Sequence, residues 1–325
     1  MSKVSVLVAA YNSAPFIREC LDSLRKQTLT DIQVIVVDDA STDETIVILE
    51  EYASMDHRFV WKRLKQNGGQ AKARNVALTM ADGDYVCMVD SDDWLGSDAL
   101  QCAAEVLDSN PSTDCVLFQV KEVYADHVRD YPMPSFDVMS GEEAFEASLT
   151  WKIHGLYMVR AGLHKHYPYD DSSMAYSDDN TTRIHYLNSR EVRQCKGIYY
   201  YRQHNNSVTH KVSARRFDYL RANESMRRQM LDCKVEKRLM NLYEKVRWLN
   251  LIDTYMFYFN NRSSLNKETC MYGKKEMLRI WRDIDTRCLP YSLRLKPGYS
   301  PLKPFWWLFV LQEEIYFSLR KLFGK

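Results

Sequence analysis

The stretch that decides the fold is Tyr85–Trp94, YVCMVDSDDW, in which a run of uncharged residues ends in three aspartates within four positions. The run Tyr85–Val89 is typical of a strand buried on both faces of a sheet, which places Asp90, Asp92 and Asp93 at its carboxyl end. Carboxylates this close repel one another unless a cation lies among them. A hard divalent cation with oxygen ligands is therefore expected here.

Two buried strands upstream also end in polar residues. Val4–Ala10 precedes Tyr11-Asn12, and Ile32–Val37 precedes Asp38-Asp39. Ligands of open parallel sheets bind outside the carboxyl ends of the strands, so the three polar clusters should face one crevice. Further strands are expected over residues 59–64 and 115–120.

Helices are expected between these strands. Pro15 can begin the first, Ser41 and Glu44 form a capping box for the second, and Ser97 caps a helix after the aspartate cluster. Another helix covers about 70–80. The alternation predicts an α/β fold with a mostly parallel sheet flanked by helices.

Beyond Lys121 the pattern becomes irregular, with a helix over 141–149, an acidic pair, Asp178-Asp179, before a helical stretch, and a strand over 197–202. From about Val212 the pattern is helical almost to Asp285. The predicted division is a catalytic domain over 1–212, with halves 1–120 and 121–212, and a helical C-terminal domain over 213–325.

The tail, residues 304–325, predicts an amphipathic helix with apolar residues at Phe305, Leu308, Leu311, Ile315, Leu319 and Leu322. Its longest apolar run has seven residues, whereas about 20 are needed to span a bilayer. Aromatic and basic flanks leave two interpretations open: a helix docked on the C-terminal domain, or one lying on a membrane surface.

Composition excludes some classes of protein. With 44 basic and 43 acidic residues among 325, the net charge is +1, which gives no electrostatic footprint for nucleic acid. Met1–Ala10 has no signal-peptide pattern, and the eight cysteines form no CxxC pair. Free thiols and a cytoplasmic location are expected.

Five ordered motifs carry a family resemblance: AYN at 10–12, ECLDSLRKQT at 19–28, VDDASTD at 37–43, ARN at 73–75 and VDSDD at 89–93. Together they make the first 95 residues resemble the family 2 glycosyltransferases, whose catalytic domain has the Rossmann-like GT-A fold. The resemblance implies inverting transfer of a sugar from a nucleotide diphosphate sugar, with a UDP-sugar favoured, to an acceptor hydroxyl. The Gln-x-x-Arg-Trp signature of processive members is absent, which implies transfer of a single sugar.

The resemblance also implies roles in metal binding, since the aspartates make a DxD motif. Asp92 would be a ligand of Mn²⁺ or Mg²⁺, and Asp90 would contact the metal's waters or the ribose of the donor. Asp93 would hold Asp90 and Asp92 in place without binding the metal itself, and His210 would be a further metal ligand.

For the donor, the resemblance implies binding by Ala10, Tyr11, Asn12, Asp39, Arg74, Asp90 and Arg202. Tyr11 would stack on the base and Asp39 would accept a hydrogen bond from a base imide, with Asp38 supporting. Arg74 would reach the diphosphate or ribose, and Arg202 or His204 would close over the diphosphate.

Inversion requires a general base on the face opposite the leaving group. The family places a Glu-Asp pair there, and Asp178-Asp179 is the matching position, with Asp179 as the base and Asp178 as the alternative. Asp170-Asp171, eight residues upstream, is a rival pair.

The implied setting is bacterial surface polysaccharide assembly, with a saccharide or lipid-linked saccharide as acceptor. If the tail binds lipid, the protein would be peripheral on the inner face of the cytoplasmic membrane. Two other functions stay open: a sugar nucleotidyltransferase, which should carry a Gly-rich, Arg-containing loop after the first strand, and a degenerate domain that binds nucleotide sugar or scaffolds a partner.

Overall fold

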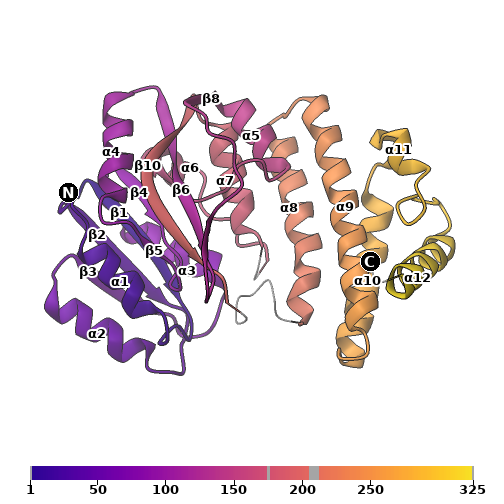
Figure 1. Ribbon diagram of the computed structural model, residues 1–325, viewed down its shortest axis with the longest axis horizontal. Coiled ribbons are helices and arrows are strands. Elements are labelled where there is room, and N and C mark those ends of the chain that lie inside the picture. Colours follow the sequence, from indigo (N-terminus) through magenta and orange to yellow (C-terminus); the bar gives the residue numbers. More distant parts are fainter. Residues whose placement is uncertain (1, 174–175, 205–211, 324–325) are drawn as a thin grey trace. The chain divides into compact units, whose positions relative to one another are not determined.

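The computed structural model describes residues 2–173, 176–204 and 212–323 (Figure 1). His210 and the Ser207–Thr209 loop lie outside the described residues. The chain divides into two compact units, residues 1–207 and 208–325. Each is described by itself below.

The first unit is built on a ten-stranded sheet, and Tyr85–Met88 of the YVCMVDSDDW stretch form a strand of its parallel part. The strands β3 (Phe59–Arg63), β2 (Ile32–Asp38), β1 (Val4–Ala10) and β4 (Tyr85–Met88) pair in parallel in that order. The register aligns Ala10 with Asp38, so the first two polar clusters meet at one edge of the sheet.

The other part of the sheet is mixed. The long strands β6 (Thr113–Val123) and β10 (Glu191–Arg202) run parallel to each other, and β9 (Tyr157–Arg160) lies antiparallel between β4 and β6. Short antiparallel strands complete it: β5 (Trp94–Leu95), β7 (Val128–Asp130) and β8 (Val138–Ser140). The prediction of a mostly parallel sheet is confirmed, because six of its strands, β1–β4, β6 and β10, point the same way.

Helices cover both faces of this sheet. They are α1 (Ile17–Arg25), α2 (Thr45–Met55), α3 (Gln70–Met80), α4 (Ala99–Ser109), α5 (Gly141–Leu149), α6 (Ala161–His166) and α7 (Asp178–Leu187). The even positions of β1, from Val4 to Ala10, pack with α1, α2 and α4 in one core, whereas α3 packs on β1 and β2 from the other side. The β-α alternation of the sequence therefore gives the layered fold that it predicts.

One predicted helix cap is wrong. The second helix begins at Thr45, with Glu44 in the N-cap position and no side-chain cap, so Ser41 and Glu44 form no capping box. Ser41 instead accepts a hydrogen bond from the backbone N–H of Asn12, 2.9 Å away, and Asp43 accepts one from Thr45 N–H at 3.0 Å. Ser41 is used to join two loops, and this long-range contact overrides the local signal.

Two other helix starts also differ from the predictions. The helix α4 begins at Ala99 after Asp98, not after Ser97, and α1 begins at Ile17, two residues beyond Pro15. A capping box does occur at Ser140, which accepts a hydrogen bond from Glu143 N–H while Glu143 accepts one from Ser140 N–H. The sequence pattern identifies these helices but not their first residues.

The second unit is helical, as predicted for the C-terminal region. Its helices are α8 (Asp218–Asp232), α9 (Lys237–Asn261), α10 (Lys267–Asp283), α11 (Tyr291–Arg294) and α12 (Trp306–Leu322), with 3-10 turns at Ala214–Phe217 and Thr286–Cys288. They enclose a core around Phe217, Trp248, Trp281 and Phe309. Among the described residues, no helix is both long and apolar enough to cross a membrane.

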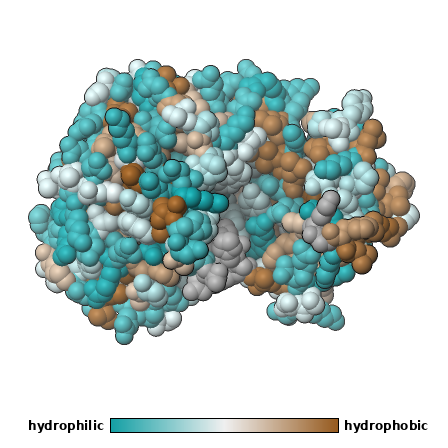
Figure 2. Space-filling view, in the orientation of Figure 1, coloured by the Kyte–Doolittle hydropathy of each residue, from teal (hydrophilic) through white to brown (hydrophobic). Residues whose placement is uncertain are grey.

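The helix α12 is amphipathic in an unusual sense, since both of its faces carry apolar residues. Phe309 and Phe317 are buried in the core of the second unit, together with Glu313. The residues that the tail pattern singled out lie on the exposed side, where Leu311, Ile315 and Leu319 are about half exposed and Leu322 is 79% exposed. Figure 2 shows hydrophobic side chains gathered over α12. The helix docks on its unit and still presents an apolar face.

Candidate functional site

A buried arginine joins three separate parts of the sequence. The side chain of Arg74, on α3, is 0% exposed. Its guanidinium donates to Asp90 Oδ1 at 2.5 Å and to Asp178 Oδ2 at 3.1 Å. The fold thus brings the ARN motif, the DxD motif and the distant acidic pair to one place, as a single site would require.

Negative charge is in excess around this arginine. Burial, together with the carboxylates of Asp92 and Asp178, raises the pKa of Asp90 to about 6, although Arg74 opposes the shift. Gln70 also donates to Asp90 Oδ1, at 2.6 Å. A carboxylate kept partly protonated by its neighbours would ionise fully if a cation were added.

Asp92 is contacted by the last described residues of the first unit. Its Oδ2 lies 2.8 Å from His204 Nε2, and its carbonyl accepts a hydrogen bond from Arg202 Nε at 2.8 Å. The Arg202 guanidinium lies over the ring of Trp94 at 4.5 Å and pairs with Glu19, while His204 stacks on Phe16. The end of β10 therefore packs against the DxD loop, and His204 contacts Asp92, the candidate metal ligand.

Asp93 has a structural position. It is 1% exposed and accepts hydrogen bonds from Tyr199 Oη at 2.9 Å and from Arg202 N–H at 2.8 Å. Burial, together with Asp90 and Asp92, raises its pKa well above the ordinary value. Tyr199 also accepts a hydrogen bond from Asp90 N–H, 3.1 Å away. Asp93 thus fixes the DxD loop to β10.

The loops after β1 and β2 are tied to each other. Asp39 N–H donates to the carbonyl of Ala10 at 2.8 Å, and Asn12 Oδ1 accepts a hydrogen bond from Thr42 N–H at 2.8 Å. Asn12 has a φ of 49°, in the left-handed region that Asn tolerates better than most residues. Tyr11, between them, is 45% exposed. Its ring is therefore accessible for stacking.

The Asp39 carboxylate organises a neighbouring turn. Its two oxygens accept hydrogen bonds from Gly68 N–H at 2.7 Å and Gly69 N–H at 2.8 Å, and its side chain is buried. Asp38 accepts a hydrogen bond from Ser41 N–H and pairs with Arg63. A contact of Asp39 with a base imide stays a prediction.

The acidic pair begins a helix. Asp178 and Asp179 occupy the first turn of α7, where the helix dipole favours carboxylates. Burial raises the pKa of Asp179 to about 7, Asp178 adds to the shift, and Arg183 and Arg74 oppose it. The rival, Asp170, accepts a hydrogen bond from Asn180 Nδ2 at 2.7 Å and so supports the start of the same helix.

The predicted metal site depends on which His, Cys, Asp and Glu side chains the fold brings together. The described residues contain no group of three or more His, Cys, Asp or Glu side chains arranged to hold a metal ion. His210 lies outside that part of the chain. The oxygen ligands of Asp90 and Asp92, with their surplus charge, suit a hard cation that keeps several waters.

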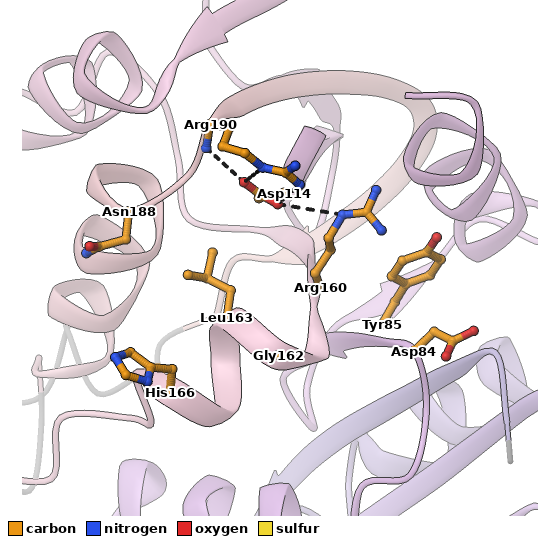
Figure 3. Close-up of a pocket in the computed structure, with 9 residues that line it drawn as sticks. All are labelled: Asp84, Tyr85, Asp114, Arg160, Gly162, Leu163, His166, Asn188 and Arg190. Carbon is orange, nitrogen blue, oxygen red and sulfur yellow. Dashed lines mark hydrogen bonds and ion pairs between the residues drawn. The ribbon is translucent and has the colours of Figure 1, made fainter. Parts of the chain in front are cut away.

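A pocket of about 800 Å³ lies elsewhere in the first unit and contains none of the predicted site residues (Figure 3). Tyr85, which lines it, begins β4, and Asp84 precedes that strand, so the pocket adjoins the opposite edge of the sheet. Its Arg190 and Arg160 both approach Asp114, which accepts a hydrogen bond from Arg190 N–H at 2.8 Å (Figure 3). These contacts join β6, β9 and the residue before β10.

Several residues of the site have no role that the sequence predicts. Gln70, Phe16, Trp94 and Glu19 contact Asp90, His204 or Arg202 only through the tertiary fold. Glu19 lies in the ECLDSLRKQT motif and Trp94 ends the YVCMVDSDDW stretch, whereas Gln70 and Phe16 carry no sequence signal.

Comparisons with known proteins now bear on this geometry. The family model Glycosyl transferase family 2 matches residues 5–167. The chain is 43% identical over 125 residues to the poly(ribitol-phosphate) beta-N-acetylglucosaminyltransferase TarS of Staphylococcus aureus strain Mu50, which is 38% of this chain and 22% of TarS. It is 30% identical over 222 residues to the uncharacterized glycosyltransferase EpsJ of Bacillus subtilis. This match covers 63% of the present chain and 62% of EpsJ.

A solved structure shows the fold over nearly the whole chain. The crystal structure of S. aureus TarS 1–349 in complex with UDP-GlcNAc matches with a TM-score of 0.75 at 23% identity, covering 99% of this chain and 92% of that chain. In the sequence comparisons, the chain spans about a fifth of the full length of TarS and about three fifths of EpsJ.

Proposed function

The chain belongs to glycosyl transferase family 2, and from that premise we propose that it moves one sugar from a nucleotide diphosphate sugar to an acceptor hydroxyl with inversion. A UDP-sugar is favoured as donor, because the matched TarS crystal structure was solved with UDP-GlcNAc. The proposal rests on the two ion pairs of Arg74, which hold Asp90 of the DxD motif and Asp178 of the acidic pair in one site.

On the donor side, the exposed ring of Tyr11 would stack on the base, beside Ala10, Asn12 and Asp39. Asp90 would contact the ribose or the metal's waters. Arg202 lies at the end of β10, where it would close over the diphosphate. The two terminal nitrogens of Arg74 each donate to a carboxylate, while its Nε is buried without a hydrogen-bond partner. Its part is therefore to fix Asp90 and Asp178 unless the donor displaces one of them.

On the acceptor side, Asp179 would remove the proton of the attacking hydroxyl. A general base works best when its pKa lies near the working pH. The raised pKa of Asp179, about 7, meets that condition. Asp178 is held by Arg74 and is the weaker candidate.

A divalent cation, Mn²⁺ or Mg²⁺, would be held by Asp92 and Asp90, with His210 as a further ligand. When bound, it supplies positive charge against the diphosphate leaving group. His204, now beside Asp92, would then exchange that contact for one with the metal or the donor.

The name of TarS, a poly(ribitol-phosphate) transferase, supports a setting in bacterial polymer synthesis. A saccharide or lipid-linked saccharide as acceptor is proposed from the family resemblance alone. The exposed apolar face of α12 supports peripheral contact with the inner face of the cytoplasmic membrane through residues 304–325. The first loop, Ala10–Ala14, lacks the Gly-rich, Arg-containing pattern of a nucleotidyltransferase.

The first test is protection against thermal unfolding by a panel of nucleotide sugars, with Mn²⁺ or with EDTA. A true donor at about 100 times its Kd should stabilise the fold by about 2.7 kcal/mol. Asp92→Ala should lose the part of the protection that depends on Mn²⁺. Asp137→Ala, whose side chain is 91% exposed, is the matched control. Protection by none of the nucleotide sugars would contradict the proposed function.

A further inference from the structure

The helix α5 ends in a conformation that its sequence does not favour. Lys152 N–H donates to the carbonyl of Ala147 at 3.0 Å, and Trp151 N–H donates to that of Ser148 at 3.2 Å. These two bonds define a Schellman motif, whose left-handed residue is usually glycine. Here that residue is Trp151, with a φ of 58°. A bulky side chain is strained in this region, so local stability does not explain the tryptophan.

The ring of Trp151 lies close to the proposed base. The guanidinium of Arg183 is 5.2 Å from the centre of a Trp151 ring. Arg183 is 4% exposed and follows Asp179 by one turn of α7, where its charge acts on the Asp179 carboxyl. One side chain therefore separates the indole from the group that would activate the acceptor.

The helix that precedes Trp151 packs closely at its start. A Cβ added to Gly141, the first residue of α5, would lie 2.5 Å from the carbonyl oxygen of Tyr186, on α7, and 2.1 Å from that of Ser189. Beyond the other end of α5, the Trp151 ring packs against Arg183 of α7, yet 44% of Trp151 is exposed. The ring therefore contacts α7 and remains open to a ligand.

We propose that Trp151 is the stacking platform for a pyranose ring of the acceptor, and this rests on the proposed function. The C–H groups of one pyranose face form a flat apolar surface that packs on an aromatic ring, and rigid aromatic side chains supply contact area at low entropic cost. An acyclic polyol phosphate offers no such face. Trp151 therefore selects a cyclic sugar as acceptor and places its hydroxyl beside Asp179.

The test separates a role in acceptor binding from one in stability. Transfer from the donor that protects the wild-type protein best is measured to octyl β-D-glucopyranoside, octyl β-D-galactopyranoside and octyl N-acetyl-β-D-glucosaminide. Trp151→Gly should raise the acceptor KM about fivefold to tenfold, the loss expected for one stacking contact, with the donor KM unchanged. Trp151→Phe keeps an aromatic face and should recover most of this loss.

The same Trp151→Gly variant should keep or slightly raise Tm, because glycine suits the left-handed position. Lys234 provides a matched control, since it has a φ of 55° and the same pair of bonds, from Lys234 N–H to Leu231 and from Val235 N–H to Met230. Lys234→Gly should likewise keep or raise Tm and leave the acceptor KM alone.

Two results would overturn the platform. One is an unchanged acceptor KM in Trp151→Gly, with or without a fall in Tm. The other is that the wild-type protein binds its donor but leaves the pyranosides unmodified, whether it glycosylates poly(ribitol phosphate) instead or no acceptor at all. Failure of every nucleotide sugar to protect or react would instead reject the proposed function itself.

Discussion

At the scale of single residues, the site depends on carboxyl groups whose pKa values are raised by their surroundings. Burial raises the pKa of Asp179 to about 7 and that of Asp90 to about 6, and Asp90 is also held by Arg74. Raised pKa values of this kind are typical of catalytic sites.

Asp179→Asn should reduce transfer about 10²-fold to 10⁴-fold, because an amide cannot accept the acceptor's proton. Donor protection should persist. In the wild-type protein, kcat/KM should rise with pH through about 7, since the base works only when deprotonated. Asp171→Asn, on an exposed residue of the rival pair, is the control. Normal turnover in Asp179→Asn would remove Asp179 from the mechanism.

Arg74→Ala should destabilise the protein by about 1.5–3 kcal/mol, because it removes charge-assisted hydrogen bonds to two partly exposed carboxylates. Urea denaturation measures this directly. Arg18→Ala serves as the comparison, since Arg18 pairs with Glu51 at the surface and such pairs contribute little. Equal stability of the two variants would show that Arg74 does not hold the site together.

At the scale of elements, α12 is the helix whose role the structure changes most. Its deletion would remove Phe309 and Phe317 from the core, so a truncated protein could not report on membrane binding alone. Point substitutions on the exposed face avoid this difficulty. The basic residues of α12, Arg320 and Lys321, lie in its last turn, while Glu313 is buried and Glu314 is paired with Arg262.

We expect Leu311→Ser, Ile315→Ser and Leu319→Ser together to lower binding to phosphatidylglycerol vesicles at least tenfold, since each removes apolar surface from the contact. Arg320→Gln with Lys321→Gln should weaken binding mainly at low salt. Met271→Ser, at a side chain 62% exposed on α10, is the control. Vesicle flotation gives the measurement. Equal binding by the triple variant and Met271→Ser would contradict the membrane proposal.

At the scale of the whole molecule, stability should depend on pH in both directions. Burial raises the pKa of Asp90 to about 6, of Asp179 to about 7 and of Glu313 to about 8. These groups favour the folded state while protonated, so stability is lost as pH rises through those values. Arg58 and Arg287 lower the pKa of Asp56 and Asp285, which contribute stability that is lost only in acid.

Tm should therefore fall from pH 7 towards pH 9. It should also fall in acid, because burial lowers the pKa of His154, His164 and His185, which must stay uncharged in the fold. Glu313→Gln should raise Tm at pH 9 and have little effect at pH 5, because glutamine resembles the protonated acid. Glu50→Gln, on an exposed residue, should change neither value. Scanning calorimetry across this range gives the comparison, and a Glu313→Gln protein no more stable than wild type at pH 9 would contradict the prediction.

The sequence by itself determines the α/β class and most elements of the first unit, because hydrophobic period and turn residues are local signals. The helices 70–80 and 141–149 have the predicted bounds. The short strand β9 was missed, since four residues in a loop-rich region carry too little pattern. The motifs at the strand ends also indicate the family, because they are read along the chain.

Only the tertiary structure decides which of these residues meet. Arg74 and Asp178 are 104 positions apart, and their ion pair forms only because the fold brings α3 and the start of α7 together. The same is true of Asp39 with the Gly68-Gly69 turn, His204 with Asp92 and Trp151 with Arg183. The pKa of each carboxyl depends on burial and on charges brought from distant segments, and neither quantity is present in a linear pattern.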